Sequence, residues 1–151
     1  MNKLIKQIQD ITTYLPDLDK TKPTVSSVAV GWHIEHILLV IRQITATVGQ
    51  SDPLLYKSKF NFTRAWVYLL NYIPRGKAKA PKIVIPSSKI NLQSLEESIL
   101  HTYQAIHYLK DCQANQYFMH PIFGDLNQKQ TIRFLAIHTE HHLKIIRDIL
   151  K

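Results

Sequence analysis

Residues 127–151 read NQKQTIRFLAIHTEHHLKIIRDILK, and this stretch decides the fold that we predict for the chain. Wound as an α-helix, at about 100° per residue, it separates into an apolar face and a charged face. His138 and His142 lie in the middle of the apolar face, where a bundle helix normally has Leu or Ile. Asn127 and Gln130 have capping-box spacing at its start. The rest of the apolar face consists of Thr131, Phe134, Leu135, Ile145, Ile146 and Ile149.

His138 and His142 are spaced to bind one metal ion together. Side chains four residues apart lie one turn apart on one face, with Cβ atoms about 5–6 Å from each other. That separation suits two imidazoles that bind one ion through bonds of about 2.0–2.1 Å. The spacing alone is a weak motif, because eight histidines produce such a pair by chance roughly one time in three. A buried histidine that is hydrogen-bonded to a neighbour is the alternative interpretation.

Four other segments repeat apolar residues at helical spacing. They cover residues 4–15, a stretch from Ser26 or Ser27 to about Val48, residues 60–72 and residues 92–113. Pro16 ends the first segment, and Gly49 is the expected stop for the second. On the helix over residues 92–113, we expect Leu92 to face inward and His107 to line a helix contact.

The connecting segments contain no strand-like alternation of any length. HPIFGDLNQ (120–128) is a turn-rich link, and KIVI (82–85) can add a short extended piece. The sequence therefore predicts a single all-α domain over residues 1–151, a four-helix bundle with one additional short helix.

A second histidine pair, His33 and His36, lies on the second predicted helix. A helical wheel places His33 near the centre of the apolar face and His36 on its flank. Burying several imidazoles without partners is costly, and bundle cores build metal sites from facing helices. On the residues alone, either histidine can supply a third ligand.

Composition limits the class of protein. The 151 residues, 45% hydrophobic and 20% charged, are typical of a globular domain, and no apolar run approaches the roughly eighteen residues of a membrane span. The N-terminal residues do not resemble a signal peptide, and the lone Cys112 fits a reducing cytoplasm. The net charge of +8 suits an acidic partner such as nucleic acid or an anionic membrane, although diffuse basicity is commoner.

Two stretches resemble the DinB/YfiT-like metal-binding superfamily: GWHIEHILLVI (31–41) and HPIFGDLNQKQTIRFLAIHTEHH (120–142). The resemblance covers nearly the whole chain in order and length. It implies an up-down-down-up four-helix bundle that holds a divalent metal, typically nickel or zinc, with three histidines. Carried over by position, these are His36, His138 and His142.

The Trp-His-x-x-His form of residues 32–36 also resembles a related domain of sulfoxide synthases, in which the second histidine binds iron. This likeness favours His36 over His33, which remains the named alternative, and it makes iron a possible metal. We expect His141 to lie beside the site or in solvent, and His120 to fix its turn.

Three neutral imidazoles leave a divalent ion its full charge and at least one open coordination position. There is no HExxH motif, and a helical wheel points Glu35 and Glu140 outward, so a hydrolase with a carboxylate base has little support. Activation of a thiol needs no such base, and the superfamily includes thiol S-transferases. We therefore favour a cytoplasmic, metal-dependent thiol-transferase that acts on a small electrophilic substrate.

Other interpretations stay open at this point. The resemblance implies a homodimer, and we expect a low-molecular-weight thiol as a partner and no membrane. A basic bundle that binds nucleic acid through residues 75–89 is the first alternative, with Arg75, Lys77, Lys79, Lys82 and Lys89 as its cations. A histidine cluster or metal with a purely structural role is the second. The sequence does not decide whether the chain is an enzyme.

Overall fold

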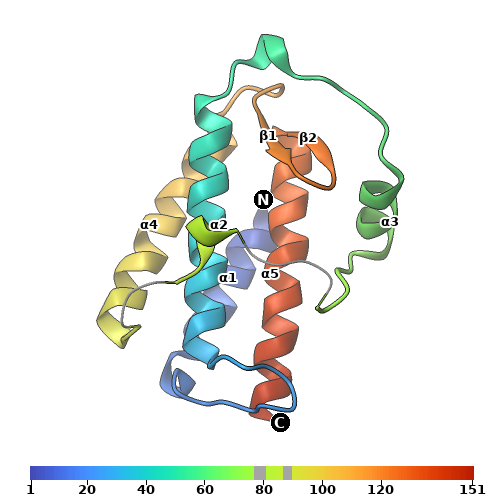
Figure 1. Cartoon of the computed structure of the whole chain (residues 1–151). Helices are drawn as coiled ribbons and strands as arrows, with labels where there is room; N and C mark the ends of the chain where they lie inside the picture. Colours follow the sequence, from blue (N-terminus) through green and yellow to red (C-terminus); the bar gives the residue numbers. More distant parts are fainter. Residues whose placement is uncertain (77–80, 87–89) are drawn as a thin grey trace.

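The computed structural model describes residues 1–76, 81–86 and 90–151. Its body consists of four long helices, α1 (Asn2–Thr12), α2 (Val30–Gln50), α4 (Leu92–Asp111) and α5 (Gln128–Leu150). They lie side by side, with α2 and α4 running in one direction and α1 and α5 in the other (Figure 1). The predicted all-α bundle in up-down-down-up order is therefore confirmed.

The core between these helices consists mainly of Leu and Ile side chains. Ile34 and Ile37 on α2 have no exposed surface, and neither have Leu135 and Leu143 on α5. Full burial of such a side chain contributes roughly 1.5–3 kcal/mol relative to an exposed one. The apolar faces predicted for α2 and α5 are thus the buried faces.

Two expectations for α4 were wrong. Leu92 is 50% exposed, and His107 is exposed instead of lining a helix contact. Leu92 is the first residue of α4, and helical side chains lean toward the N-terminus, so its side chain points away from the turns of α4 that follow it. His107 lies outside the buried stripe that Thr102, Ile106 and Leu109 form.

The bounds of α2 differ from the prediction at both ends. The helix begins at Val30, not at Ser26 or Ser27, because the Ser26 hydroxyl accepts a hydrogen bond from the Val28 N–H and holds a turn there. At the other end, Gly49 lies inside α2. A Cβ at this position would collide with the end of the Tyr108 ring, so glycine leaves room for that ring against α2.

The segment between α2 and α4 contains the additional short helix, α3 (Phe62–Leu70), within the predicted range of residues 60–72. The Asn61 side chain caps its first turn, and Asn71 ends it in the left-handed conformation with φ of 48°. The extended piece expected at residues 82–85 was wrong. The chain forms a 3₁₀ turn, η3 (Lys82–Val84), closed by bonds from Val84 N to Pro81 O and from Ile85 N to Lys82 O.

The turn-rich link before α5 contains a β-hairpin that the sequence did not predict. Strands β1 (Tyr117–His120) and β2 (Gly124–Asn127) pair antiparallel, with Phe118 opposite Leu126. Strands of four residues are at the lower limit for an alternating pattern in the sequence. β2 leads directly into α5, where Asn127 and Gln130 form the predicted capping box. Within the described ranges, no helix is both long enough and apolar enough to span a bilayer.

Candidate metal centre

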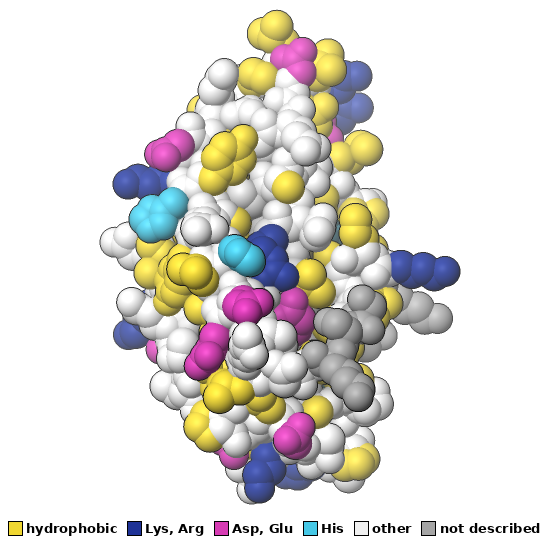
Figure 2. All heavy atoms as spheres, turned by 90° about the vertical axis from the view of Figure 1, so that its left-hand side faces the viewer, with side chains coloured by type: hydrophobic (Ala, Val, Ile, Leu, Met, Phe, Trp, Pro, Cys, Tyr) yellow, Lys and Arg dark blue, Asp and Glu magenta, His cyan; other side chains and the backbone are white. Residues whose placement is uncertain are grey.

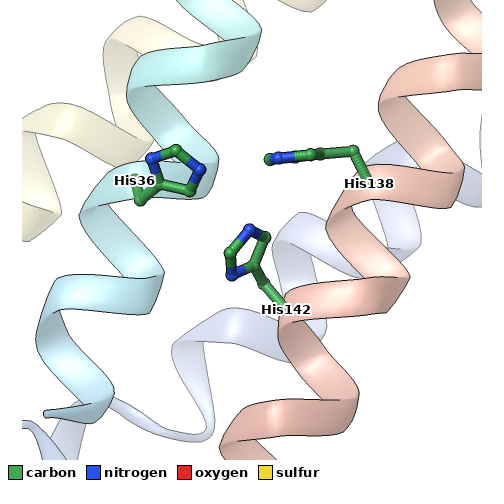
Figure 3. Close-up of side chains that lie close together, drawn as sticks. All are labelled: His36, His138 and His142. Atoms are coloured by element: carbon green, nitrogen blue, oxygen red, sulfur yellow. The ribbon is translucent and has the colours of Figure 1, made fainter. Parts of the chain in front are cut away.

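The structure brings His36 of α2 together with His138 and His142 of α5. Figure 3 shows the three rings facing one another across the space between the two helices. One nitrogen from each ring lies within 4.8 Å of the other two, and the ring centroids are 4.7–5.3 Å apart. Two nitrogens bound to one ion lie at most about 4.2 Å apart, twice the bond length to His nitrogen. Small rotations of the side chains are therefore enough to close the cluster on one ion.

The ring of His36 is fixed by the backbone of η3. Its Nδ1 lies 2.7 Å from the carbonyl oxygen of Val84, a distance at which Nδ1–H donates to that oxygen. The proton is thereby placed on Nδ1, so Nε2 keeps the lone pair that a metal ligand needs. Trp32 stacks on a face of the His36 ring, with ring centroids 5.0 Å apart and an interplanar angle of 12°.

His142 is held by His33, one turn before His36 on α2. The two Nδ1 atoms are 3.0 Å apart, and the Nε2 of His33 lies 2.9 Å from the Ser26 hydroxyl. One arrangement of protons satisfies both contacts and leaves the Nε2 of His142 free to bind a cation. In it, His142 donates from Nδ1 to His33, and His33 donates from Nε2 to Ser26. This places His33 beside the cluster, behind a ligand candidate.

His138 lacks such a partner. Its Nδ1 is buried and has no hydrogen-bond partner within the described part of the chain. Buried polar atoms are rarely left unpaired, because each costs about 1–3 kcal/mol. A cation that the cluster bound through this nitrogen would give it a partner, so the side chains present fit a metal.

The electrostatics of the cluster also suit a cation. Burial lowers the pKa of His36, and burial followed by the neighbouring His36 lowers that of His138 well below its usual value. Burial and the nearby His138 likewise lower the pKa of His142, and burial lowers that of His33 to about 4. The rings are therefore neutral at neutral pH, and their lone pairs are available for metal binding.

Neither glutamate that we considered as a base joins the cluster. Glu35 forms an ion pair with Arg42 at 3.0 Å, beside a polar pocket of about 190 Å³ that His101 also lines. Acidic, basic and histidine side chains gather on this face of α4 (Figure 2). Glu140 pairs with Arg147 at 2.9 Å and accepts a bond from Gln7. Both are partly buried in ion pairs instead of pointing freely outward, and the part of the chain that the structure describes adds no carboxylate to the cluster.

The other histidines occupy distinct places. His120 accepts hydrogen bonds at Nδ1 from the N–H groups of Ile122 and Phe123, so the prediction that it fixes its turn is confirmed. His141 is half-buried, contacts the ring of His142 and is bonded through Nδ1 to the Ile73 carbonyl. It lines a cavity of about 30 Å³, which is large enough to hold a water molecule.

Sequence reasoning missed the contacts that hold the cluster in place. No sequence pattern predicted the contacts of the Val84 carbonyl and the Ser26 hydroxyl, because both groups lie in turns whose shape the sequence did not indicate. His33 was visible, but only as a rival ligand. Of the basic residues predicted to bind nucleic acid, Lys77, Lys79 and Lys89 lie outside the described residues. Arg75 is described and forms an ion pair with Asp148 at 2.8 Å.

Comparison with known proteins agrees with this arrangement. A family model described as the DinB superfamily matches residues 9–146, which is most of the chain. The resemblance predicted from the two histidine-containing stretches is therefore confirmed. No curated protein and no solved structure matches the chain.

Proposed function

This chain belongs to the DinB superfamily, and we propose that it is a metal-dependent enzyme that activates a thiol. The observation that carries the proposal is the cluster of His36, His138 and His142, two buried imidazoles and one partly buried one that can hold a metal ion. No carboxylate joins them among the residues that the structure describes. The reaction is of the thiol S-transferase type, with a small electrophilic molecule as the second substrate.

The three histidines hold the ion without adding charge to it. Because all three rings are neutral at neutral pH, the bound ion keeps its full positive charge. When bound, a divalent ion lowers the pKa of a thiol beside it, so that the nucleophilic thiolate is present near neutral pH. The hydrogen bonds from His36 to Val84 and between His142 and His33 keep the two rings oriented.

A hydrolase is less well supported. A general base must lie within hydrogen-bond reach of the proton that it removes, directly or through one water. Glu35 forms an ion pair with Arg42, and Glu140 forms one with Arg147, both outside the cluster. Thiol activation avoids this requirement, because proximity to the ion itself favours the thiolate.

The nature of the ligands limits the choice of metal. Imidazole suits zinc, nickel, iron and copper, whereas magnesium and calcium prefer oxygen ligands. We propose zinc or nickel, with iron as the alternative. A low-molecular-weight thiol as substrate, a homodimer and a cytoplasmic location stay predictions.

Metal content of the purified protein tests the foundation of the proposal. We expect about one equivalent of zinc or nickel in the wild-type protein and a large loss of it in His36→Ala, His138→Ala and His142→Ala. His101→Ala is the matched control, because His101 is an exposed histidine on α4. Absence of stoichiometric metal, or equal retention in His138→Ala and wild type, would overturn the proposal.

A thiol titration of the cobalt-substituted protein tests the chemistry. Binding of a thiolate to cobalt should produce a new charge-transfer band in the near ultraviolet, and the band should be missing in His142→Ala. If the metal is purely structural, the spectrum should not respond to thiols while chelation still lowers the melting temperature. That combination would replace the enzymatic proposal with the structural one.

A further inference from the structure

Helix α3 presents an apolar stripe to solvent. Phe62, Trp66, Leu69 and Leu70 are 75%, 59%, 70% and 61% exposed, respectively. Their spacing of four, seven and eight residues from the first places them on one side of the helix. The ring of Phe60, itself 73% exposed, packs edge-on against Phe62 and extends the stripe. Apolar groups gathered on a surface in this way mark an interaction site more often than scattered ones do.

The opposite side of α3 is attached to the bundle by polar contacts. Arg64 donates to the carbonyl oxygens of Phe123 and Asp125, and the Tyr68 hydroxyl donates to the carbonyl of Gln130 at 2.7 Å. The guanidinium of Arg133 lies over the Tyr68 ring, 5.1 Å from its centroid. Figure 1 shows α3 standing at the side of the four-helix body. These contacts fix the helix with its apolar stripe facing outward.

The same segment carries the whole net charge of the chain. Residues 53–91 contain eight Lys and Arg residues and no Asp or Glu, whereas the eleven remaining basic residues balance the eleven acidic ones. Lys57 and Lys59, just before α3, are both exposed. Of the eight, Lys77, Lys79 and Lys89 lie outside the described residues and Arg75 pairs with Asp148, so Lys57 and Lys59 supply the exposed positive charge that directly precedes the apolar stripe.

We propose that the α3 stripe docks on an anionic lipid bilayer, with α3 lying in the plane of the interface. Helices that bind this way have Trp, Phe and Leu on one face and are attracted by basic residues to anionic lipid. The proposal is independent of the metal centre. It departs from our expectation that no membrane is a partner, which rested on the lack of a spanning segment.

Charge decides between this occupant and a second copy of the chain. A two-fold dimer through α3 would place the same patch of both copies face to face. The exposed Lys57 and Lys59 of the two copies would then be brought together and repel each other. Single-stranded nucleic acid can use basic and aromatic residues, but it offers nothing to Leu69 and Leu70. An anionic bilayer accommodates both features.

Vesicle sedimentation of the full chain tests the proposal. The protein should bind vesicles of phosphatidylcholine containing phosphatidylglycerol, bind phosphatidylcholine alone much more weakly, and dissociate as salt rises. Leu70→Ser should reduce partitioning about tenfold, since one apolar side chain is lost from the interface. Leu100→Ser is the matched control, because Leu100 on α4 is equally exposed, at 58%. Its partitioning should equal that of wild type.

Charge reversal and fluorescence provide two further readouts. Lys57→Glu with Lys59→Glu should weaken binding, whereas Lys3→Glu with Lys6→Glu, an equal change of charge on exposed residues of α1, should have a much smaller effect. Tryptophan emission should shift to the blue on adding the anionic vesicles, and Trp66→Phe should lose this shift while Trp32 remains.

Three results would overturn the proposal. One is the absence of binding to phosphatidylglycerol vesicles. Another is a dimer in sedimentation velocity that Leu70→Ser dissociates, without vesicle binding. The third is salt-sensitive binding of a single-stranded oligonucleotide that the lysine reversal abolishes while vesicles do not bind.

Discussion

The contact between the Nδ1 atoms of His33 and His142 lets His33 determine which nitrogen of His142 carries the proton. If His142 donates at Nδ1, its Nε2 can bind a cation; if His33 donates instead, the proton of His142 sits on Nε2 and blocks binding. His33→Ala should therefore weaken metal binding by about 10–100-fold, as losses of such supporting partners do. A competition titration against a chromophoric chelator measures this affinity.

His33→Gln and His101→Ala are the comparisons for this variant. The glutamine oxygen can accept the same hydrogen bond, so His33→Gln should keep more of the affinity than His33→Ala. His101→Ala should bind like wild type, because His101 is exposed on α4. Equal affinity in wild type and His33→Ala would show that His142 is oriented without this contact.

His120 should make stability depend on pH. Burial lowers its pKa from 6.5 to about 4, so the folded chain favours the neutral ring, whose Nδ1 accepts two backbone bonds. This stabilisation is complete above the unfolded pKa of 6.5 and is lost as the pH falls toward about 4. Because the ring is partly exposed, we expect the loss of this stabilisation to lower the free energy of unfolding by about 1–2 kcal/mol.

Urea unfolding of wild type and His120→Asn at neutral and acidic pH measures this effect. Asparagine can accept the same two backbone bonds without titrating, so the variant should lose less stability in acid than wild type. Parallel losses in the two proteins would assign the pH dependence to other groups.

The choice between His33 and His36 shows what a single residue's position can and cannot predict. The helical wheel averages apolar positions along the whole of α2, which packs against both α4 and α5. It correctly predicted that both rings are buried, at 4% and 3% exposure. It could not tell which of them turns toward His138, because that depends on where α5 crosses α2. The family resemblance supplied that information.

At the scale of the element, α5 depends on the cap that orients its first turn. The Asn127 Oδ1 accepts a bond from Gln130 N–H at 2.9 Å, and the Gln130 Oε1 accepts one from Asn127 N–H at 3.1 Å. Asn127→Ala should lower the free energy of unfolding by about 1 kcal/mol, whereas Asn127→Ser, which can still cap, should stay close to wild type. Denaturant unfolding compares the two, and identical midpoints would show that the cap contributes little.

Predictions at this scale succeeded where an element was long and periodic. The capping box and apolar face of α5 were readable from local sequence, and so was the core face of α2. The hairpin at residues 117–127 was not, because each strand has four residues and its shape depends on Gly124 at φ of 71° and on His120. The outward orientation of α3 was also hidden. Periodicity identifies an apolar face but not whether another element covers it.

At the scale of the whole molecule, the predicted bundle followed from the number of periodic segments, and its up-down-down-up order followed from the family resemblance. The histidine cluster joins positions 36 and 138, which are distant in sequence, and no local pattern shows that α2 and α5 are neighbours. The same holds for the apolar stripe of α3. The excess of basic residues around it can be counted in the sequence, whereas the exposure of its apolar side chains is visible only in the structure.

A metal ion that binds the folded cluster and not the unfolded chain must stabilise the whole molecule. The gain is about 2.7 kcal/mol when free metal is one hundred times Kd, which for a domain of this size raises Tm by about 5–10 °C. Thermal melting with and without metal measures it. His36→Ala should show no metal-dependent shift and His101→Ala the full one, and comparing each variant with itself removes any effect on the fold. A full shift in His36→Ala would place the ion outside this cluster.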